Sequence, residues 1–397
     1  MDTSHMPLTQ NILSATITEL INDFEELSYL YNSHIIILTH YAKTMSKVSS
    51  LLPNEASTFT FRHIEKCLSL FTSNSKKIDS VKISLIKKTN INIQHFINLK
   101  RHFYEVLRTH QGVFSFLLTA TDWQSPSFSH STYSQAGKQT GQIKLSLNDY
   151  KRDHHIDEKR YERSFVKEYI DAPLKFPIVS YVTNSGMSAF STLLHFLLHE
   201  GILKENVVIG NSIYFQNKTL IKGFPHIQIN AVNESNHTDI VNCIKKAKPS
   251  VIIFDSLTNT NEVFLPDLYQ IINFIVKNSK HDIVIIVDNT CLSIAFQPFN
   301  LIMGKTRKVQ LYVFESLLKY HQFGMDRTNA GIIYGYGKDA SKLFYYRRDM
   351  GTNISDSAVY SLPTPNRKFL EKRLVRLNRN ATYLAVFLQN TISDLNS

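Results

Sequence analysis

Cysteine is scarce in this chain, and long apolar runs are missing. Cys67, Cys243 and Cys291 are the only cysteines in 397 residues, and none of them forms a Cys-x-x-Cys pair. An odd number without that spacing argues against a disulfide framework and against a structural zinc site. The sequence has no run of 18 apolar residues to span a membrane, and its first residues, MDTSHMPLTQ, lack the basic and apolar segments of a secretory signal. We therefore expect a cytoplasmic protein without a metal site or a membrane contact.

Positive charge is abundant but not concentrated. The formal net charge is +11, yet the Lys and Arg residues are spread along the chain and form no dense basic arm. A locally basic stretch such as residues 367–379 is more typical of a solvated helix face than of a nucleic-acid patch. We expect no nucleic-acid partner.

The chain has two regions with different sequence patterns. Residues 8–120 carry apolar residues at a spacing of three to four, which predicts helices. A Ser/Thr/Gln/Gly-rich stretch at 121–142 is typical of a linker. From residue 177 onward short Val/Ile-rich runs alternate with helical segments, which predicts an α/β domain whose mostly parallel sheet is covered by helices. We predict four parts, namely a helical N-terminal region (1–120), the linker (121–142), an α/β domain (143–345) and the start of a C-terminal domain (346–397).

Chemically versatile residues follow the predicted strands. Ligands bind outside the carboxyl ends of such strands. An amine, a carboxylate, an aromatic ring and a glycine turn together suit a cofactor with an aldehyde, a pyridine ring and a phosphate. The candidates are Ser185, Gly186, Met187, Tyr214, Asn259, Asp288 and Lys319.

The motifs DYKRDHHIDEKRYERSF, TNSGMSA, VDNTCLS and SLLKY occur in this order. In that set the chain resembles the pyridoxal-phosphate enzymes of cysteine and methionine metabolism, such as cystathionine γ-synthase, the cystathionine lyases and methionine γ-lyase. The resemblance covers roughly residues 145–390. It implies a fold type I pyridoxal-phosphate transferase with a seven-stranded sheet flanked by helices, an extra helical N-terminal region and a truncated C-terminal domain.

The resemblance also assigns roles around the cofactor ring. Lys319 would form the Schiff base and move the proton, and Asp288 would keep the pyridine nitrogen protonated. Tyr214 would stack on the cofactor ring and assist the proton transfer. Asn259 would form a hydrogen bond to the phenolic oxygen of the cofactor. These roles imply elimination or replacement at the β or γ carbon of a sulfur-containing or related amino acid, through an external aldimine and a quinonoid.

The phosphate ligands follow from the same resemblance. The turn Ser185-Gly186-Met187 would bind the phosphate through backbone N–H groups, and Ser316 would add a hydroxyl. Tyr150 and Arg152 match the family's Tyr-x-Arg, which reaches the phosphate of a neighbouring subunit. That match implies a homodimer or homotetramer.

Two departures keep other functions open. Leu318 stands where the family commonly has a hydroxyl, and no residue corresponds to the arginine that grips the substrate carboxylate in the family's C-terminal domain. An aminotransferase on the same fold is one alternative. A non-catalytic interaction protein is another, with the N-terminal helices as the surface for a protein partner.

Overall fold

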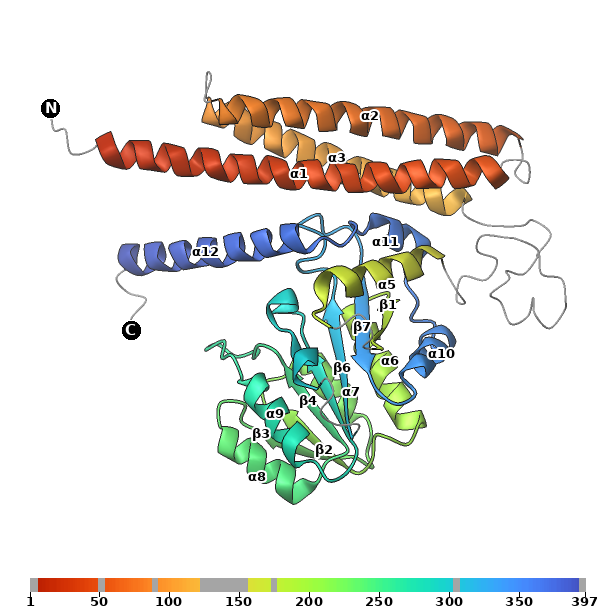
Figure 1. Cartoon of the computed structure of the whole chain (residues 1–397), viewed down its shortest axis with the longest axis vertical. Coiled ribbons are helices and arrows are strands. Elements are labelled where there is room, and N and C mark those ends of the chain that lie inside the picture. Colours follow the sequence, from red (N-terminus) through yellow and green to blue (C-terminus); the bar gives the residue numbers. More distant parts are fainter. Residues whose placement is uncertain are drawn as a thin grey trace. The chain divides into compact units, whose positions relative to one another are not determined.

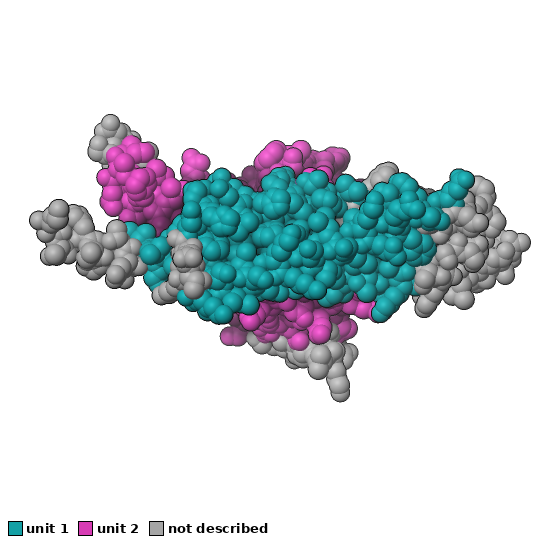
Figure 2. Space-filling model, turned by 90° about the horizontal axis from the view of Figure 1, so that it is seen from above, with its two compact units in different colours: residues 1–149, 360–364 teal, residues 150–359, 365–397 magenta. Residues whose placement is uncertain are grey.

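The computed structural model describes residues 6–48, 54–87, 92–121, 156–172, 177–302 and 308–392 of the chain. The chain divides into two compact units (Figure 2). Unit 1 comprises residues 1–149 and 360–364, and unit 2 comprises residues 150–359 and 365–397. Each unit encloses a hydrophobic core of its own.

Unit 1 contains three long helices that lie side by side (Figure 1). Apolar residues recur every three or four positions along each helix, which places them on one face. Phe24, Leu27 and Tyr31 of the first helix are buried in this way. The rings of Phe71 and Phe103 lie edge-on to Tyr31, at centroid distances of 5.6 and 6.5 Å. The helices are α1 (Met6–Val48), α2 (Asn54–Ile86) and α3 (Ile93–Thr121), which confirms the predicted helical N-terminal region.

A short, distant segment also belongs to unit 1. The backbone N–H of Thr364 donates to the hydroxyl of Ser33 at 2.8 Å, and that hydroxyl donates to the side chain of Thr364 at 3.0 Å. The side-chain amide of Gln111 donates to the carbonyl of Ser361. Residues 360–364 are thus bound by polar side chains of α1 and α3.

Unit 2 is built on a seven-stranded sheet with the strand order β1-β7-β6-β5-β4-β2-β3. The strands from β3 to β6 along this order pair in parallel, whereas β7 is antiparallel to β6 and to β1. The sheet is therefore mostly parallel, as predicted, and the Val/Ile-rich runs from residue 177 onward form its strands. The strands are β1 (Val179–Thr183), β2 (Asn206–Gly210), β3 (Gln228–Val232), β4 (Val251–Asp255), β5 (Ile283–Asp288), β6 (Val309–Ser316) and β7 (Gly331–Tyr336).

Helices flank the sheet (Figure 1). The central strands β4, β5 and β6 are buried along almost their whole length, which explains why β4 and β5 are continuously apolar before their final aspartates. One face of the sheet packs against α6, where Phe190 and Leu193 share a core with Ile253 and Ile286. The helices of unit 2 are α5 (Ile156–Tyr169), α6 (Gly186–His199), α7 (Phe215–Lys222), α8 (His237–Ala247), α9 (Leu268–Asn278), α10 (Leu343–Asp349) and α12 (Arg367–Thr391), and α11 (Asp356–Ser361) runs from unit 2 into the segment that belongs to unit 1.

A buried ion cluster joins α5, β1 and α10. The guanidinium of Arg347 donates to the carboxylate of Glu162 at 2.7 Å and to the carbonyl of Val182 at 3.0 Å. Its second terminal nitrogen lies 3.3 Å from the carboxylate of Glu158. All three charged side chains are buried, so their pairing offsets the cost of removing them from water. The cluster fixes the edge strand β1 against two helices.

No helix in the described part of the chain is both long enough and apolar enough to cross a membrane. The described residues also contain no group of three His, Cys, Asp or Glu side chains arranged for a metal ion. The predicted linker 121–142 lies outside the described residues except for Thr121. The predicted domain boundaries and the shortened C-terminal domain stay predictions.

Candidate active site

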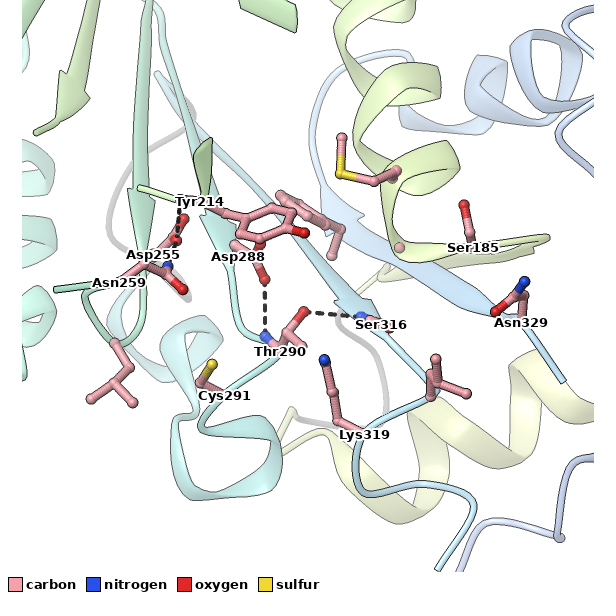
Figure 3. Close-up of a pocket in the computed structure, with 15 residues that line it drawn as sticks. Ser185, Tyr214, Asp255, Asn259, Asp288, Thr290, Cys291, Ser316, Lys319 and Asn329 are labelled. Atoms are coloured by element: carbon pink, nitrogen blue, oxygen red, sulfur yellow. Dashed lines mark hydrogen bonds between the residues drawn. The ribbon is translucent and has the colours of Figure 1, made fainter. Parts of the chain in front are cut away.

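Polar side chains meet at the carboxyl edge of the parallel strands. β4 and β5 end at Asp255 and Asp288, which are direct neighbours in the strand register, and β6 ends at Ser316. Ligands of α/β sheets bind outside this edge. A cavity of about 300 Å³ lies here (Figure 3). It is lined by Ser185, Gly186, Met187, Tyr214, Asp255, Leu257, Asn259, Asp288, Thr290, Cys291, Phe314, Ser316, Leu318, Lys319 and Asn329.

The turn between β1 and α6 forms one wall of the cavity. Ser185 has an extended backbone and caps α6, because its hydroxyl accepts from the N–H of Ser188 at 3.0 Å. Gly186 is the first helical residue, and a Cβ at this position would lie only 2.9 Å from the Cβ of Ser316. Glycine is required for α6 to approach β6 this closely. Since the first N–H groups of a helix lack partners within it, those of Gly186 and Met187 suit an anion.

Asp288 is the last residue of β5. Its carboxylate accepts from the N–H of Thr290 at 3.1 Å and from the side-chain amide of Asn217 at 3.2 Å. Burial raises the pKa of the Asp288 carboxyl above its usual range, and the hydrogen bonds from Thr290 and Asn217 oppose that rise. A protonated ring nitrogen facing this carboxylate would lower the same pKa, because an opposite charge favours the ionised form.

Asp255 connects two of the predicted site residues. Its Oδ2 accepts from the backbone N–H of Tyr214 at 2.7 Å and from the side-chain amide of Asn259 at 2.7 Å. Tyr214 directly precedes α7, and its side chain lines the cavity (Figure 3). The sequence prediction does not include Asp255. The signal that could have identified it is its position, because it ends an apolar strand just as Asp288 does.

Lys319 lies in the turn after β6, and its side chain lines the cavity (Figure 3). The side chain is exposed, and no ion pair joins its amine to any acidic residue that the structure describes. An amine in this setting is available to react with a carbonyl group. Leu318, beside it, lines the same cavity with an apolar side chain.

Other lining residues were not predicted from the sequence. The hydroxyl of Thr290 accepts from the N–H of Ser316 at 3.0 Å and so connects the ends of β5 and β6. Cys291 is a free cysteine that is exposed as a residue, although its thiol is partly buried. Partial burial and then the carboxylates of Asp288 and Asp255 raise the pKa of the Cys291 thiol.

All predicted site residues that the structure describes line this one cavity. They are Ser185, Gly186, Met187, Tyr214, Asn259, Asp288, Ser316 and Lys319. Tyr150 and Arg152 lie outside the described residues.

Comparisons with known proteins show what this chain is similar to. A family model described as "Cys/Met metabolism PLP-dependent enzyme" matches residues 119–394. Cystathionine gamma synthase from Xanthomonas oryzae pv. oryzae, solved in complex with cystathionine, is 18% identical with a TM-score of 0.50, over 68% of this chain and 64% of that chain. Cystathionine gamma-lyase from Lactobacillus plantarum, solved with L-serine, is 20% identical with a TM-score of 0.50, over 66% of this chain and 63% of that chain. At these identities the two structures show a shared fold.

A curated relative matches a smaller part of the chain. The bifunctional enzyme flvA of Aspergillus flavus is 21% identical over 202 residues, which are 51% of this chain and 24% of that protein. The chain therefore spans about a quarter of the length of this relative and slightly less than two thirds of each of the two solved structures.

Proposed function

Since the chain belongs to the family of Cys/Met metabolism PLP-dependent enzymes, we propose that it is a lyase or transferase that eliminates or replaces a group at the β or γ carbon of a sulfur-containing or related amino acid. The cofactor of this family is pyridoxal phosphate. The observation that supports the proposal best is the convergence of an amine, a carboxylate, an aromatic ring and a helix N-terminus on one cavity.

The residues present fit the phosphate of this cofactor. The backbone N–H groups of Gly186 and Met187 and the hydroxyl of Ser316 line the cavity and are suitable donors. The dipole of α6 favours negative charge at its N-terminus. Leu318 adds no hydroxyl, so one phosphate contact implied by the resemblance is missing. Tyr150 and Arg152 stay predicted phosphate ligands from a neighbouring subunit.

The residues also fit the ring. Asp288 would pair with the protonated pyridine nitrogen, and Tyr214 would cover one face of the ring. Asn259 uses one N–H of its amide for Asp255, and its second N–H is available for the phenolic oxygen. The hydrogen bonds from Thr290 and Asn217 hold the Asp288 carboxylate in place before any ligand arrives.

The proposed chemistry assigns a proton to Lys319. When bound, pyridoxal phosphate supplies an electron sink that stabilises negative charge on a substrate carbon. The amine of Lys319 would hold the aldehyde carbon covalently until a substrate amine replaces it. The freed amine would then take the proton from the α carbon and act as a general base. Tyr214 lines the same cavity and would assist this transfer.

Cofactor binding and turnover test the proposal together. The wild type, Lys319→Ala and the control Lys338→Ala are incubated with pyridoxal phosphate and then dialysed; Lys338 is exposed and does not line this cavity. We expect the wild type and Lys338→Ala to be yellow and to release a keto acid from at least one sulfur-containing amino acid. We expect Lys319→Ala to be colourless and inactive. A wild type without colour and without turnover would overturn the proposal in favour of a non-catalytic interaction protein.

The same proposal includes three further points. The chain forms a homodimer or homotetramer, its N-terminal helices bind a protein partner, and it is located in the cytoplasm. The relevant support for assembly is the predicted role of Arg152, which would make cofactor binding depend on a second copy of the chain. Light scattering of the protein with and without pyridoxal phosphate measures that dependence.

A further inference from the structure

A second carboxyl group lines the cavity beside Asp288. Asp255 is the register partner of Asp288 on the adjacent parallel strand, so the two side chains leave the same edge of the sheet (Figure 3). Asp255 is only 5% exposed. Its Oδ2 accepts both hydrogen bonds, from Tyr214 and from Asn259, whereas its Oδ1 is buried and has no hydrogen-bond partner among the described residues.

The charges around Asp255 are predominantly negative. Asp288 ends the neighbouring strand β5, and the buried Glu234 follows β3, which lies on the other side of β4 in the strand order. The thiol of Cys291 and the amine of Lys319 line the same cavity. Burial, then Asp288, then Glu234 raise the pKa of Asp255 well above its usual range, whereas the two hydrogen bonds to Oδ2 oppose the rise. Two buried neighbouring carboxyl groups cannot both ionise without a large cost.

We propose that Asp255 is a positioning residue that carries a proton on Oδ1 and holds Tyr214 and Asn259 through Oδ2. Its role toward the cofactor rests on the proposed function, whereas its proton is a property of the chain itself. A proton on Oδ1 leaves Oδ2 as an acceptor, which is what the N–H of Tyr214 and the amide of Asn259 require.

The proton on Asp255 has a consequence for Asp288. If Asp255 is neutral, Asp288 is the single negative charge of the pair that faces the cofactor ring. Asp255 then holds Tyr214 over the cofactor ring and Asn259 near the phenolic oxygen of the cofactor. It does not compete with Asp288 for the ring nitrogen. Asp288 thus provides the negative charge, and Asp255 keeps Tyr214 and Asn259 in position.

The first test uses cofactor-free protein, prepared by dialysis against hydroxylamine. Asp255→Asn replaces the proposed acid by a neutral group of the same shape that keeps an acceptor for Tyr214 and Asn259. A carboxyl whose pKa is raised by folding stabilises the folded state below its unfolded pKa, and this contribution is lost as the pH rises toward the folded pKa. We therefore expect Asp255→Asn to gain stability over the wild type as the pH rises from acid to neutral, with the ratio of unfolding constants changing by up to about tenfold per pH unit.

The control Asp282→Asn lies immediately before β5, at the opposite end of that strand, and is exposed. Its stability relative to the wild type is expected to stay nearly constant over the same pH range. An equally constant difference for Asp255→Asn would show that Asp255 is ionised in the folded protein and would overturn the proposal.

The second test measures affinity for pyridoxal phosphate by equilibrium dialysis. We expect Asp255→Asn to bind within about twofold of the wild type, and Asp255→Ala, which loses the acceptor for two hydrogen bonds, to bind about tenfold or more weakly. Equal losses in both variants would mean that the charge of Asp255 is needed, which contradicts the proposal. Absence of binding by the wild type would overturn the proposed function, while the pH series on cofactor-free protein would still decide whether Asp255 holds the proton.

Discussion

The sheet of unit 2 and the helices of unit 1 place their polar side chains differently. In the sheet of unit 2, β4 and β5 are apolar until their last residues, Asp255 and Asp288, which reach the cavity. In unit 1, buried polar residues such as Ser33 and Gln111 occur within the helices. Those two side chains bond the segment 360–364.

This difference assigns ligand binding to the polar groups at the strand ends and stabilisation of the fold to those in unit 1. Polar groups at the end of a strand remain accessible to a ligand, because the sheet edge opens into the cavity. In the helical core of unit 1, the hydroxyl of Ser33 and the side-chain N–H of Gln111 form hydrogen bonds to residues 360–364. Substitutions at the strand ends should therefore change cofactor binding and turnover, whereas substitutions in unit 1 should change stability alone.

The largest effect is expected for Asp288→Asn. A neutral amide cannot hold the pyridine nitrogen protonated, so turnover should fall by about 10²–10³-fold, the range for loss of one preorganised electrostatic contact. Cofactor should still bind, because the phosphate donors and Lys319 are unchanged. Steady-state kinetics with Asp282→Asn as the control measures this. Wild-type turnover in Asp288→Asn would show that another residue is the partner of the ring.

The second prediction concerns the stability of unit 2 rather than its cavity. Arg347→Ala leaves Glu158 and Glu162 buried without their cation, which should lower the free energy of unfolding by about 3–5 kcal/mol. Its neighbour Arg348 pairs with the exposed Asp349, and Arg348→Ala should cost less than about 1 kcal/mol. Urea titrations followed by circular dichroism compare the two variants. Equal losses would remove the special role of the buried cluster.

The third prediction concerns unit 1. Ser33→Ala removes two hydrogen bonds to Thr364 and should cost about 1–3 kcal/mol of stability. The control Ser80→Ala removes only an exposed bond to the carbonyl of Lys76 and should change little. Both variants should bind pyridoxal phosphate like the wild type. Weaker cofactor binding by Ser33→Ala at unchanged stability would contradict the separation of the two units' roles.

The smallest effect is a change in thiol labelling. Cys291 lines the cavity, whereas Cys67 is buried, so iodoacetamide should modify Cys291 before Cys67. The pKa of the Cys291 thiol is raised, mainly by partial burial and by Asp288, so its labelling should keep accelerating at alkaline pH after an ordinary thiol has levelled off. Pyridoxal phosphate should slow the reaction at Cys291 severalfold. Peptide mass spectrometry measures the rates, and labelling of Cys291 that ignores the cofactor would place the ligand elsewhere.

The sequence predicts the sheet well because of its burial. Strands covered on both faces need no polar alternation, so runs such as VIIFD and DIVIIVD are recognisable without a structure. Since parallel strands end at one edge, the polar residues that follow them can be grouped before their contacts are known.

Contacts that depend on strand register or on distant segments could not be predicted. The pairing of Asp255 with Asp288 follows from the alignment of β4 against β5, which the sequence does not encode locally. The bond between Ser33 and Thr364 joins residues far apart in the chain, and neither residue stands out in its own segment. Residues 360–364 and the pairing of Asp255 with Asp288 were missed for this reason, although Asp255 itself is recognisable as the end of an apolar strand.

The most direct test of the central claim is borohydride reduction of the wild-type protein after incubation with pyridoxal phosphate. Reduction converts a reversible bond between the lysine and the aldehyde into a stable amine, which peptide mass spectrometry locates. We expect one added pyridoxyl phosphate group on the peptide that contains Lys319, and none on that peptide in Lys319→Ala. An adduct confined to other lysines, or no adduct at all, would contradict the assignment of this cavity as the cofactor site.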